Sequence, residues 1–553
     1  MSIARMAMMV LAPKAKAFEN ATLDPMAAQK AILLEYLSRN KDTEYGRKYH
    51  FSEIRTIEQY RSTVPLVEYE NIRPYINKMT AGETNILVKD KVLFFGATSG
   101  TTAEPKYIPS TGYSEVKKAL LTDIWSYYIV RDHPGILKGK ILAIVSPQVE
   151  GHTECGIPYG AESGYGYNEL PFFVKNLYVL PHDVFEIKDY AARYYTILRI
   201  AIEHNITTVA TLNPNTIVLL CQKIKGLQDL IIQDIEKGTL NKKLTIESPI
   251  RKKLESRLKA NKKRADELKR IVRDHGELSP GKLWPEMEIV ECWKGGAMKM
   301  YLKELESYFK GVPIRDMGCL STEARNSIPM SDSGAGGALA ITTNFYEFIP
   351  KEDAEKSDKR ALTCDQLEVG GEYFIVVTTA GGLYRYNIDD LIKVNGFLHK
   401  TPIIEFVQKG TNAVSLAGEK LYESQVNEAI VRVIGAGSLT VEFFCVAAEI
   451  KGFPRYSFLI EFSQAAVSRQ DKLKFLKSFE TELRKQNREY DFTRESQILG
   501  NPVLKVIKSG EFERYRAKRV AAGAHDGQFK APELVGDGSF QDNFAVEEEI
   551  KLE

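Results

Sequence analysis

The spacing of apolar residues predicts a helical start to the chain. Residues 27–37 place apolar side chains three and four positions apart, and we expect helices through most of residues 18–63. A further amphipathic helix is predicted for residues 113–130. Its apolar face carries Leu120, Leu121, Ile124 and Trp125. Helices with one apolar face pack that face against a core.

Three short apolar runs, residues 140–146, 207–212 and 288–292, predict buried strands. A helix is expected after the second run, beyond Asn213-Pro214-Asn215. Buried strands that alternate with helices indicate an α/β architecture.

The second half of the chain predicts more β structure. Two β-rich stretches, residues 338–348 and 372–379, flank a charged loop at residues 351–360 that we expect to face solvent. Near the C-terminus the pattern predicts strands at residues 441–446 and 456–462 and a helix at 470–486. This last part is expected to form a small α+β domain.

Residues 150–170 combine many glycines with aromatic residues, among them Tyr159, Tyr165 and Tyr167. Such a composition is typical of irregular structure. Two interpretations stay open: a loop beside the substrate, or a long excursion over the surface.

Length and charge narrow the class of protein. With 553 residues, 44% of them hydrophobic, the chain can bury more than one core, so two or more domains are expected. Lys and Arg total 75 against 73 acidic residues, a net charge of +2. A nucleic-acid-binding surface needs a clear basic excess. Residues 248–275 predict one basic helix, but Glu255, Asp266 and Glu267 interleave, which favours a solvated face.

No secretory or membrane-spanning segment is predicted. The apolar run within residues 1–16 is short, and Lys14 and Lys16 follow it without a cleavage site, so we expect a docked N-terminal helix. No apolar run approaches the roughly 20 residues that span a bilayer.

The six cysteines are far apart in sequence and form no C-x-x-C pair, which argues against a zinc site or a disulfide framework. They are Cys155, Cys221, Cys292, Cys319, Cys364 and Cys445. We expect buried, reduced thiols and a cytoplasmic location. Cys319 is not expected to act as a nucleophile, because no histidine is an obvious partner for it.

The segment with the most chemical information is residues 94–106, which sets four hydroxyl side chains and two glycines behind an apolar run. Glycine lets backbone N–H groups approach an anion, and the hydroxyls add donors, so the segment predicts a phosphate-binding loop. It is not a Walker loop, because Lys106 lies between Pro105 and Tyr107. The alternative is a polar surface turn.

Three later segments favour the first interpretation. Residues 317–323 end in Ser321-Thr322-Glu323 after a predicted strand, and a carboxylate there can hold Mg²⁺ against phosphates. Residues 382–390 predict a strand that ends in Asp389-Asp390, where one carboxylate can accept both hydroxyls of a ribose. Residues 527–532 hold Lys530 between an aromatic residue and a proline, which suits a lysine that brings positive charge to a site.

Taken in order, these four segments resemble the motifs of the acyl-adenylate-forming superfamily, and more closely those of the auxin-responsive (Gretchen Hagen) acyl-acid amido synthetase family. Residues 98–109 are similar to the family's phosphate loop, residues 321–323 to its Ser-Ser-Glu motif, residues 381–390 to its third motif and residues 523–533 to its tail. The resemblance extends from about Lys30 to Val535.

The resemblance implies an α/β fold: a large N-terminal acyl-adenylate-forming domain of sheets with flanking helices, and a small mobile α+β domain. It places a hinge after the predicted strand at residues 403–407, which gives domains 1–408 and 409–553. It also implies an ATP- and magnesium-dependent ligase that adenylates a carboxylic acid, releases pyrophosphate, and passes the acyl group to an amine or amino acid with release of AMP.

The resemblance assigns roles to particular residues. The phosphates are expected to meet Thr98, Ser99, Gly100, Thr101 and Thr102. The remaining ATP-binding candidates are Ser321, Tyr384, Lys420 and Asp390, with Asp390 on the ribose and Asp389 as its substitute. Three residues are the catalytic candidates: Thr322 toward the α-phosphate, Glu323 for Mg²⁺, and Lys530 between the carboxylate and the α-phosphate.

Some positions depart from the family pattern: Glu104, Asn387, Asp389 and Glu533. Adenylation stays the expected first step, and the departures leave the acceptor open. The alternatives are a thioester ligase that uses coenzyme A or a carrier protein, and a nucleotide-binding protein without catalysis. The pattern identifies neither the acid nor the amine, nor the number of subunits.

Overall fold

The computed structural model describes residues 3–98, 106–354, 356, 358–410, 413–414, 416, 419, 421–437, 439–449, 454–464, 466–495, 499–522 and 529–552. The chain divides into a larger unit, Met1–Gly295 with Glu304–Phe406, and a smaller unit, Gly296–Lys303 with Val407–Glu553. Helices and sheets alternate through both units, so the α/β class predicted from the sequence is confirmed.

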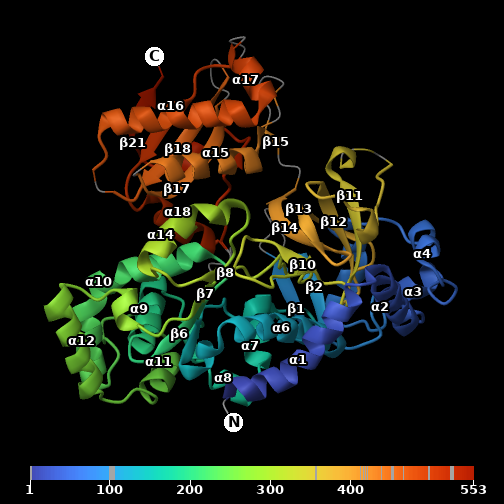
Figure 1. Ribbon diagram of the computed structural model, residues 1–553, viewed down its shortest axis with the longest axis horizontal. Helices are drawn as coiled ribbons and strands as arrows, with labels where there is room; N and C mark the ends of the chain where they lie inside the picture. Colours follow the sequence, from blue (N-terminus) through green and yellow to red (C-terminus); the bar gives the residue numbers. More distant parts are fainter. Residues whose placement is uncertain are drawn as a thin grey trace. The chain divides into compact units, whose positions relative to one another are not determined.

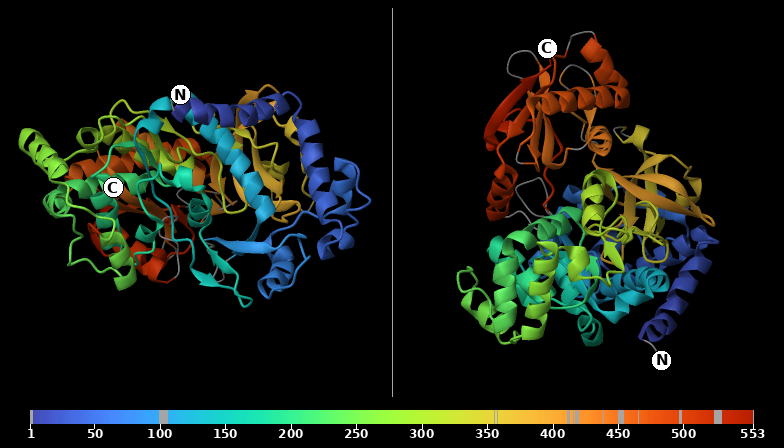
Figure 2. Two further views of the ribbon diagram at one scale, coloured as in Figure 1. Left: turned by 90° about the horizontal axis from the view of Figure 1, so that it is seen from below. Right: turned by 60° about the vertical axis from the view of Figure 1, so that its left-hand side comes forward.

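The helical N-terminus is confirmed. Five helices open the larger unit: α1 (Ile3–Ala21), α2 (Pro25–Asn40), α3 (Glu44–Lys48), α4 (Ile57–Thr63) and α5 (Tyr69–Thr80). Helix α1 lies along α6 (Gly112–Asp132) and buries Ala15 and Phe18 (Figures 1 and 2). The N-terminal segment is therefore a docked helix, as its short apolar run predicts.

The first sheet has the order β2-β1-β5-β4. Its strands are β1 (Val92–Thr98), β2 (Lys106–Thr111), β4 (Gly151–His152) and β5 (Pro158–Gly160). Residues 150–170, which the sequence predicts to be irregular, instead contain two short strands and helix α7 (Glu162–Glu169). Aromatic packing explains this order: the ring of Tyr165 stacks on Phe94 with centroids 4.4 Å apart.

The second sheet is parallel throughout, in the order β3-β6-β7-β8. Its strands are β3 (Lys140–Ala143), β6 (Ile206–Ala210), β7 (Ile289–Glu291) and β8 (Ile314–Arg315), as the apolar runs predict. The helices between its strands in sequence are α8 (Phe172–Lys175), α9 (Tyr190–Ala201), α10 (Pro214–Lys237), α11 (Ser248–Glu255), α12 (Lys262–His275), α13 (Pro280–Leu283) and α14 (Lys299–Tyr308), several of which are labelled in Figure 1. The first residues of α14, up to Lys303, belong to the smaller unit.

The prediction of one basic helix over residues 248–275 is wrong, because α11 and α12 are separate helices. Asn261 is the N-cap residue of α12 and lies in the break between the two helices. Its side chain accepts the N–H of Arg264 at 3.1 Å and caps α12, while its own N–H donates to the carbonyl of Ile235 at 2.9 Å. An asparagine with these bonds begins a helix and ends the segment before it.

The third sheet has the order β11-β12-β13-β14-β10-β9. Its strands are β9 (Ser327–Ile328), β10 (Gly337–Leu339), β11 (Phe345–Pro350), β12 (Glu372–Thr378), β13 (Tyr386–Leu398) and β14 (Thr401–Lys409). The charged loop after β11 is less open to solvent than expected, because Asp353 is wholly buried and accepts hydrogen bonds from Lys356 and Arg360.

The smaller unit contains a five-stranded sheet in the order β20-β17-β18-β19-β21. Its strands are β17 (Val441–Glu449), β18 (Arg455–Phe462), β19 (Val503–Ile507), β20 (Leu534–Val535) and β21 (Val546–Lys551), beside a hairpin of β15 (Ala413–Val414) and β16 (Leu421–Tyr422). Phe444 and Val446 pack against α15 (Glu423–Ala436) and α16 (Arg469–Gln486). Phe443 and Cys445 pack on the other face, with α18 (Glu511–Ala521). Helix α17 (Arg488–Glu495) follows α16.

Short 3-10 helices complete the described structure: η1 (Pro134–Lys138), η2 (His182–Val184), η3 (Gly296–Met298), η4 (Lys351–Asp353), η5 (Cys364–Gln366) and η7 (Phe540–Asn543).

Five of the six cysteines are buried as expected, but Cys155 is exposed in the turn between β4 and β5. In the part of the chain that the structure describes, no helix has the length and apolar character to cross a bilayer.

Candidate functional site

Strands β1 and β2 hold the two ends of the predicted phosphate loop. They pair antiparallel, and Thr98 at the end of β1 faces Lys106 at the start of β2. The ammonium nitrogen of Lys106 lies 5.7 Å from the ring centroid of Tyr69. Ser99, Gly100, Thr101, Thr102 and Glu104 lie outside the described residues.

The Ser-Thr-Glu segment forms a tight turn after β8. Leu320 and Arg325 pair across it, and the N–H of Ser321 donates to the carbonyl of Ala324 at 2.9 Å. This turn sets Thr322 and Glu323 at its tip. The predicted location beyond a strand end is therefore correct.

The turn and the phosphate-loop strand lie in direct contact. A Cβ atom at Gly96 in β1 would lie 2.5 Å from Cγ2 of Thr322 and 3.2 Å from Oε2 of Glu162. Real Cβ atoms do not approach other carbons that closely, so this strand position requires glycine for close approach. Two motifs far apart in sequence therefore meet here.

The third motif packs against the same strands. A Cβ at Gly381 would lie 2.8 Å from the carbonyl oxygen of Pro109 in β2. Tyr384 is wholly buried: its hydroxyl donates to the carbonyl of Leu87 at 2.9 Å, and its ring stacks on Tyr45. Tyr384 thus anchors the motif in the core, and a direct contact with a nucleotide stays a prediction.

Arg385 is a structural residue that the sequence did not identify as such. Its guanidinium donates to both carboxylate oxygens of Glu347 at 2.8 Å, and to the carbonyls of Arg61 and Val64 at 2.7 and 2.6 Å. Both Arg385 and Glu347 are buried. The sequence signal for this ion pair was Glu347, a charged residue within the otherwise apolar strand β11.

The predicted strand does not end at Asp390, because β13 runs on through it to Leu398. Asp389 has φ 66°, in the left-handed region, and its N–H donates to Oδ1 of Asn387 at 3.0 Å. Glycine suits this conformation, and aspartate or asparagine adopts it with local side-chain support. The departures at Asn387 and Asp389 therefore compensate each other.

Acidic side chains from two motifs surround Tyr386. Burial raises the pKa of the Tyr386 hydroxyl, and the charges of Glu323, Asp390 and Asp389 raise it further. Glu323 and Asp390 are only 9% and 8% exposed. The fold therefore brings the predicted metal carboxylate and the predicted ribose carboxylate to the same tyrosine.

This acidic group fits Mg²⁺ only together with a phosphate ligand. Among the described residues, no cluster of three or more His, Cys, Asp or Glu side chains could hold a metal alone. Magnesium commonly takes one or two protein carboxylates and fills its other positions with phosphate oxygens and water. Glu323 at the tip of its turn suits that mode.

Sequence reasoning missed a second polar group at Gly96. Lys118 on α6 donates to Ser110 Oγ at 2.9 Å and forms ion pairs with Glu115 at 2.9 Å and with Glu162. Burial raises the pKa of Glu162, although Lys118 opposes the shift. The spacing of Glu115 and Lys118 on one helix was a signal, but nothing local pointed to Glu162.

Lys530 lies in the smaller unit and is exposed. Its charge acts on Glu423 and Glu533, which are half-buried and whose pKa values are raised by desolvation above all. Glu533, which departs from the family pattern, is thus part of the environment of Lys530. Lys420 lies outside the described residues.

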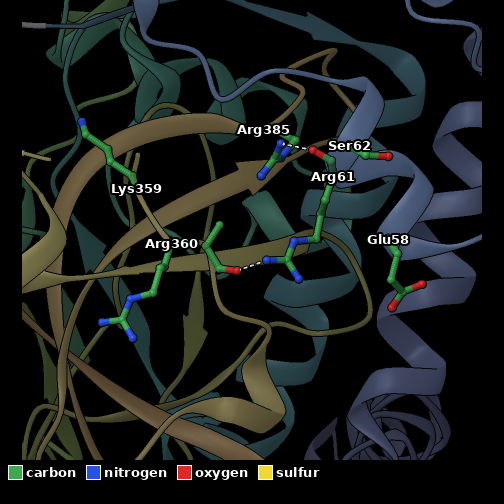
Figure 3. A pocket seen from close by; sticks show the side chains of 7 residues that line it. Glu58, Arg61, Ser62, Lys359, Arg360 and Arg385 are labelled. Carbon is green, nitrogen blue, oxygen red and sulfur yellow. Dashed lines mark hydrogen bonds between the residues drawn. The ribbon is translucent and has the colours of Figure 1, made fainter. Parts of the chain in front are cut away.

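A surface pocket of about 350 Å³ lies behind Arg385 (Figure 3). The guanidinium of Arg61 donates to the carbonyl of Ala361, and that of Arg385 donates to the carboxylate of Glu347. Lys359 and Arg360 extend away from Arg61 (Figure 3). Because these side chains do not converge, we do not assign a ligand to the pocket.

Comparison with known families identifies the chain. It matches the GH3 family N-terminal domain over residues 14–314, the GH3 family central domain over 337–409 and the GH3 family C-terminal domain over 423–539. The chain belongs to the GH3 family. The resemblance inferred from its motifs is therefore confirmed.

GH3 relatives align along most of the chain. An indole-3-acetic acid-amido synthetase of Arabidopsis thaliana, GH3.4, is 25% identical over 94% of this chain and 91% of its own. The solved structure of the AtGH3.15 acyl acid amido synthetase with 2,4-DB has a TM-score of 0.85 at 20% identity and covers 97% of this chain and 96% of that one. A 2-hydroxyisobutyryl-CoA ligase has a TM-score of 0.53 at 10% identity, over 93% of this chain and 89% of its own. These structures share the fold.

Proposed function

We propose that this GH3 protein is an ATP-dependent acyl-acid amido synthetase. It adenylates a carboxylic acid and then joins the acyl group to an amine or amino acid. The observation that carries the proposal is the contact of Thr322 with Gly96, which joins the Ser-Thr-Glu turn to the strand of the phosphate loop. The names of the GH3 relatives, all amido synthetases, support the same reaction.

The first half-reaction overcomes the poor leaving group of a carboxylate. An oxygen of the carboxylate attacks the α-phosphorus of ATP, the bond to the bridging oxygen breaks, and pyrophosphate leaves. Negative charge spreads over the α-phosphate in the transition state, so fixed donors and cations there lower the barrier. The product is a mixed anhydride whose acyl carbon now carries AMP as its leaving group.

The residues of the larger unit have distinct proposed roles. Thr322 donates to the α-phosphate from the tip of its turn, next to Ser321. Thr98, Ser99, Thr101 and Thr102 hold the phosphates, with Gly100 giving access to the backbone. Glu323 would hold Mg²⁺, which neutralises phosphate charge when bound. Asp390 accepts the ribose hydroxyls, with Asp389 as the substitute.

The smaller unit supplies the proposed lysine. Lys530 neutralises charge on the carboxylate and the α-phosphate during adenylation, and Lys420 is a secondary ATP contact. Residues 1–408 and 409–553 are the proposed functional domains, and movement of the second would exchange adenylation for acyl transfer. Removal of Lys530 should lower the adenylation rate much more than ATP affinity.

In the second half-reaction an amine attacks the acyl carbon, the C–N bond forms, the C–O bond to AMP breaks, and the amine loses a proton. We propose an amino acid as the acceptor; the relatives are named amido synthetases, which supports an amine over a thiol. A cytoplasmic location is proposed from the free thiols of all six cysteines, five of them buried.

The test is product analysis with purified protein. An acid, ATP, Mg²⁺ and a mixture of amino acids should give AMP and an acyl amide of the expected mass. Parallel reactions with coenzyme A in place of amino acids should leave free thiol unchanged. Loss of free thiol, without amide, would replace the proposal with a thioester ligase. AMP formation without either product would exclude both.

A further inference from the structure

The guanidinium of Arg325 is partly buried, and no ion pair to it is present among the described residues. It follows Glu323 by two residues, and its guanidinium carbon lies 5.3 Å from the ring centroid of Trp125 on α6. Among the described residues, its Nη1 has no hydrogen-bond partner. A buried donor without a partner lowers stability unless a bound group accepts its hydrogen bond.

The backbone at Arg325 is held by neighbouring side chains and by a backbone bridge. The amide of Asn344 and the hydroxyl of Tyr346 both donate to the carbonyl oxygen of Arg325, at 3.3 and 3.4 Å. Arg325 also pairs with Leu320 across the turn that carries Thr322. The backbone of Arg325 is thereby fixed relative to the proposed adenylation residues, and its guanidinium lies over the ring of Trp125.

Two other buried donors of the larger unit also lack partners among the described residues. Trp125 is 8% exposed, and its Nε1 has no hydrogen-bond partner within the described part of the chain. The same is true of Nη1 of Arg315, whose other nitrogens are paired with Asp132 and Asp332. Buried donors without partners are rare in proteins and point to a water or ligand that the protein itself does not supply.

Glu291 is the nearby acid that could serve as a counter-ion, but it is not in position to do so. No ion pair within 4 Å joins it to Arg325 or Arg315, in the described structure. Burial raises the pKa of Glu291 to about 8, although Arg315 and Arg325 both lower it. Near neutral pH the carboxyl is therefore mostly protonated and adds a further donor. Asp316, the other acid near Arg325, already accepts the backbone N–H groups of Lys294 and Gly318.

We propose that Arg325 and Trp125 form a subsite for a second anionic group on the acid substrate. The preferred acids would then be dicarboxylic acids or acids of similar charge. This inference rests on the proposed function, because it concerns the acid that is adenylated.

The two ends of such an acid meet different elements. Thr322 contacts β1 at Gly96, whereas Arg325 reaches α6 at Trp125. The carboxylate that attacks ATP belongs beside Thr322. A guanidinium bound to that same carboxylate would stabilise it in the ground state and slow its attack. The charge of Arg325 therefore suits the far end of the substrate.

The test measures acid-dependent ATP–pyrophosphate exchange with matched pairs of acids, hexanoate against adipate and benzoate against isophthalate. In the wild type, kcat/KM should be higher for the diacid of a pair. Arg325→Met should lower the ratio of diacid to monoacid by roughly 10- to 100-fold, because a buried charge-assisted contact is lost. The ratio for Arg325→Lys should lie between those of the wild type and Arg325→Met.

Arg131 supplies a matched control. It also lies on an aromatic ring of α6, 4.9 Å from the centroid of Tyr128, but it is paired with Asp132. Arg131→Met should leave the ratio unchanged. Equal losses for monoacid and diacid in Arg325→Met would overturn the proposal, because Arg325 would then hold the reacting carboxylate. An unchanged ratio would overturn it as well.

Two measurements without catalysis separate this inference from the proposed function. If no acid supports exchange, a diacid should still raise the melting temperature of the wild type and not that of Arg325→Met; no shift in the wild type would overturn the subsite. In the absence of acid, Arg325→Met should melt at or above the wild-type temperature, because a partly buried guanidinium whose Nη1 has no partner among the described residues is removed. A melting temperature lowered by several degrees would show that the guanidinium supports the fold and would overturn the proposal.

Discussion

Arg385 lies in the third motif and Arg325 two residues after the Ser-Thr-Glu segment, both in the larger unit, and their surroundings are opposite. Arg385 has both oxygens of Glu347 and two backbone carbonyls around its guanidinium. Arg325 has the face of Trp125 and an Nη1 without a partner among the described residues. A charge surrounded by fitted acceptors serves the fold. A charge that is buried without them is available to a ligand.

The largest expected effect is at the paired arginine. Arg385→Met should lower the free energy of unfolding by up to about 3–5 kcal/mol, because the buried Glu347 would lose both hydrogen bonds to Arg385 and keep only the ion pair with Arg61 at 3.3 Å. Urea titration followed by circular dichroism measures the change. The double variant Arg385→Met with Glu347→Met should recover much of the loss. If the single variant unfolds like the wild type, the comparison between the two arginines fails.

The contact between the two motifs gives the next largest effect. Gly96→Ala sets a Cβ against Thr322 and should lower stability by about 1–3 kcal/mol. We also expect the exchange rate to fall at least about tenfold, because displacement of catalytic groups by about 1 Å is costly. Gly226→Ala in α10 is the control, since its Cβ would meet no atom within 4 Å. Equal behaviour of both variants would show that the contact does not position Thr322.

The carboxyl beside Arg325 makes a prediction about pH. Glu291 has its pKa raised from 4.5 to about 8, so the folded state keeps a proton that the unfolded state loses in this range. Its contribution to stability is greatest at low pH and falls by up to about 1.4 kcal/mol per pH unit as the pH rises toward 8.

Glu291→Gln removes that proton binding. Relative to the wild type, the variant should therefore gain stability as the pH rises from 5 to 8, by urea titration at each pH. Glu286→Gln is a suitable control, because this exposed side chain bonds only Asn205. A pH profile for Glu291→Gln that runs parallel to the wild type would mean that Glu291 is ionised and pairs with Arg325 after all.

The smallest effect concerns the local partner of Asp389. Asn387→Ala removes the acceptor of the Asp389 N–H and should lower stability by about 0.5–1 kcal/mol. Asp389→Gly should restore most of it, because glycine adopts the left-handed conformation without support. If Asn387→Ala is neutral by itself, the two departures from the family pattern are independent.

Much of the fold follows from local patterns. The apolar periodicity of α6 and the apolar runs of β3, β6 and β7 depend on neighbours in sequence, and they were predicted. The regular structure of residues 150–170 was not predicted, because it depends on the stacking of Tyr165 in α7 on Phe94 in β1. The break at Asn261 depends on a bond to Ile235, which no local pattern shows.

The candidate site divides in the same way. Thr322, Glu323 and Asp390 were found because their motifs are local. The contact of Gly96 with Thr322, the pair of Lys118 with Glu162 and the unpaired charge of Arg325 join segments far apart in the chain. Such features depend on tertiary packing, so a single sequence does not disclose them.

Acid-dependent ATP–pyrophosphate exchange, measured without any acceptor, tests the central claim most directly. A panel of mono- and dicarboxylic acids would be compared with wild-type protein, Glu323→Gln and Lys530→Ala. We predict exchange with at least one acid, reduced about 100-fold or more in both variants while ATP still binds. Measurable ATP binding with no exchange for any acid, or exchange that both variants retain, would contradict the account.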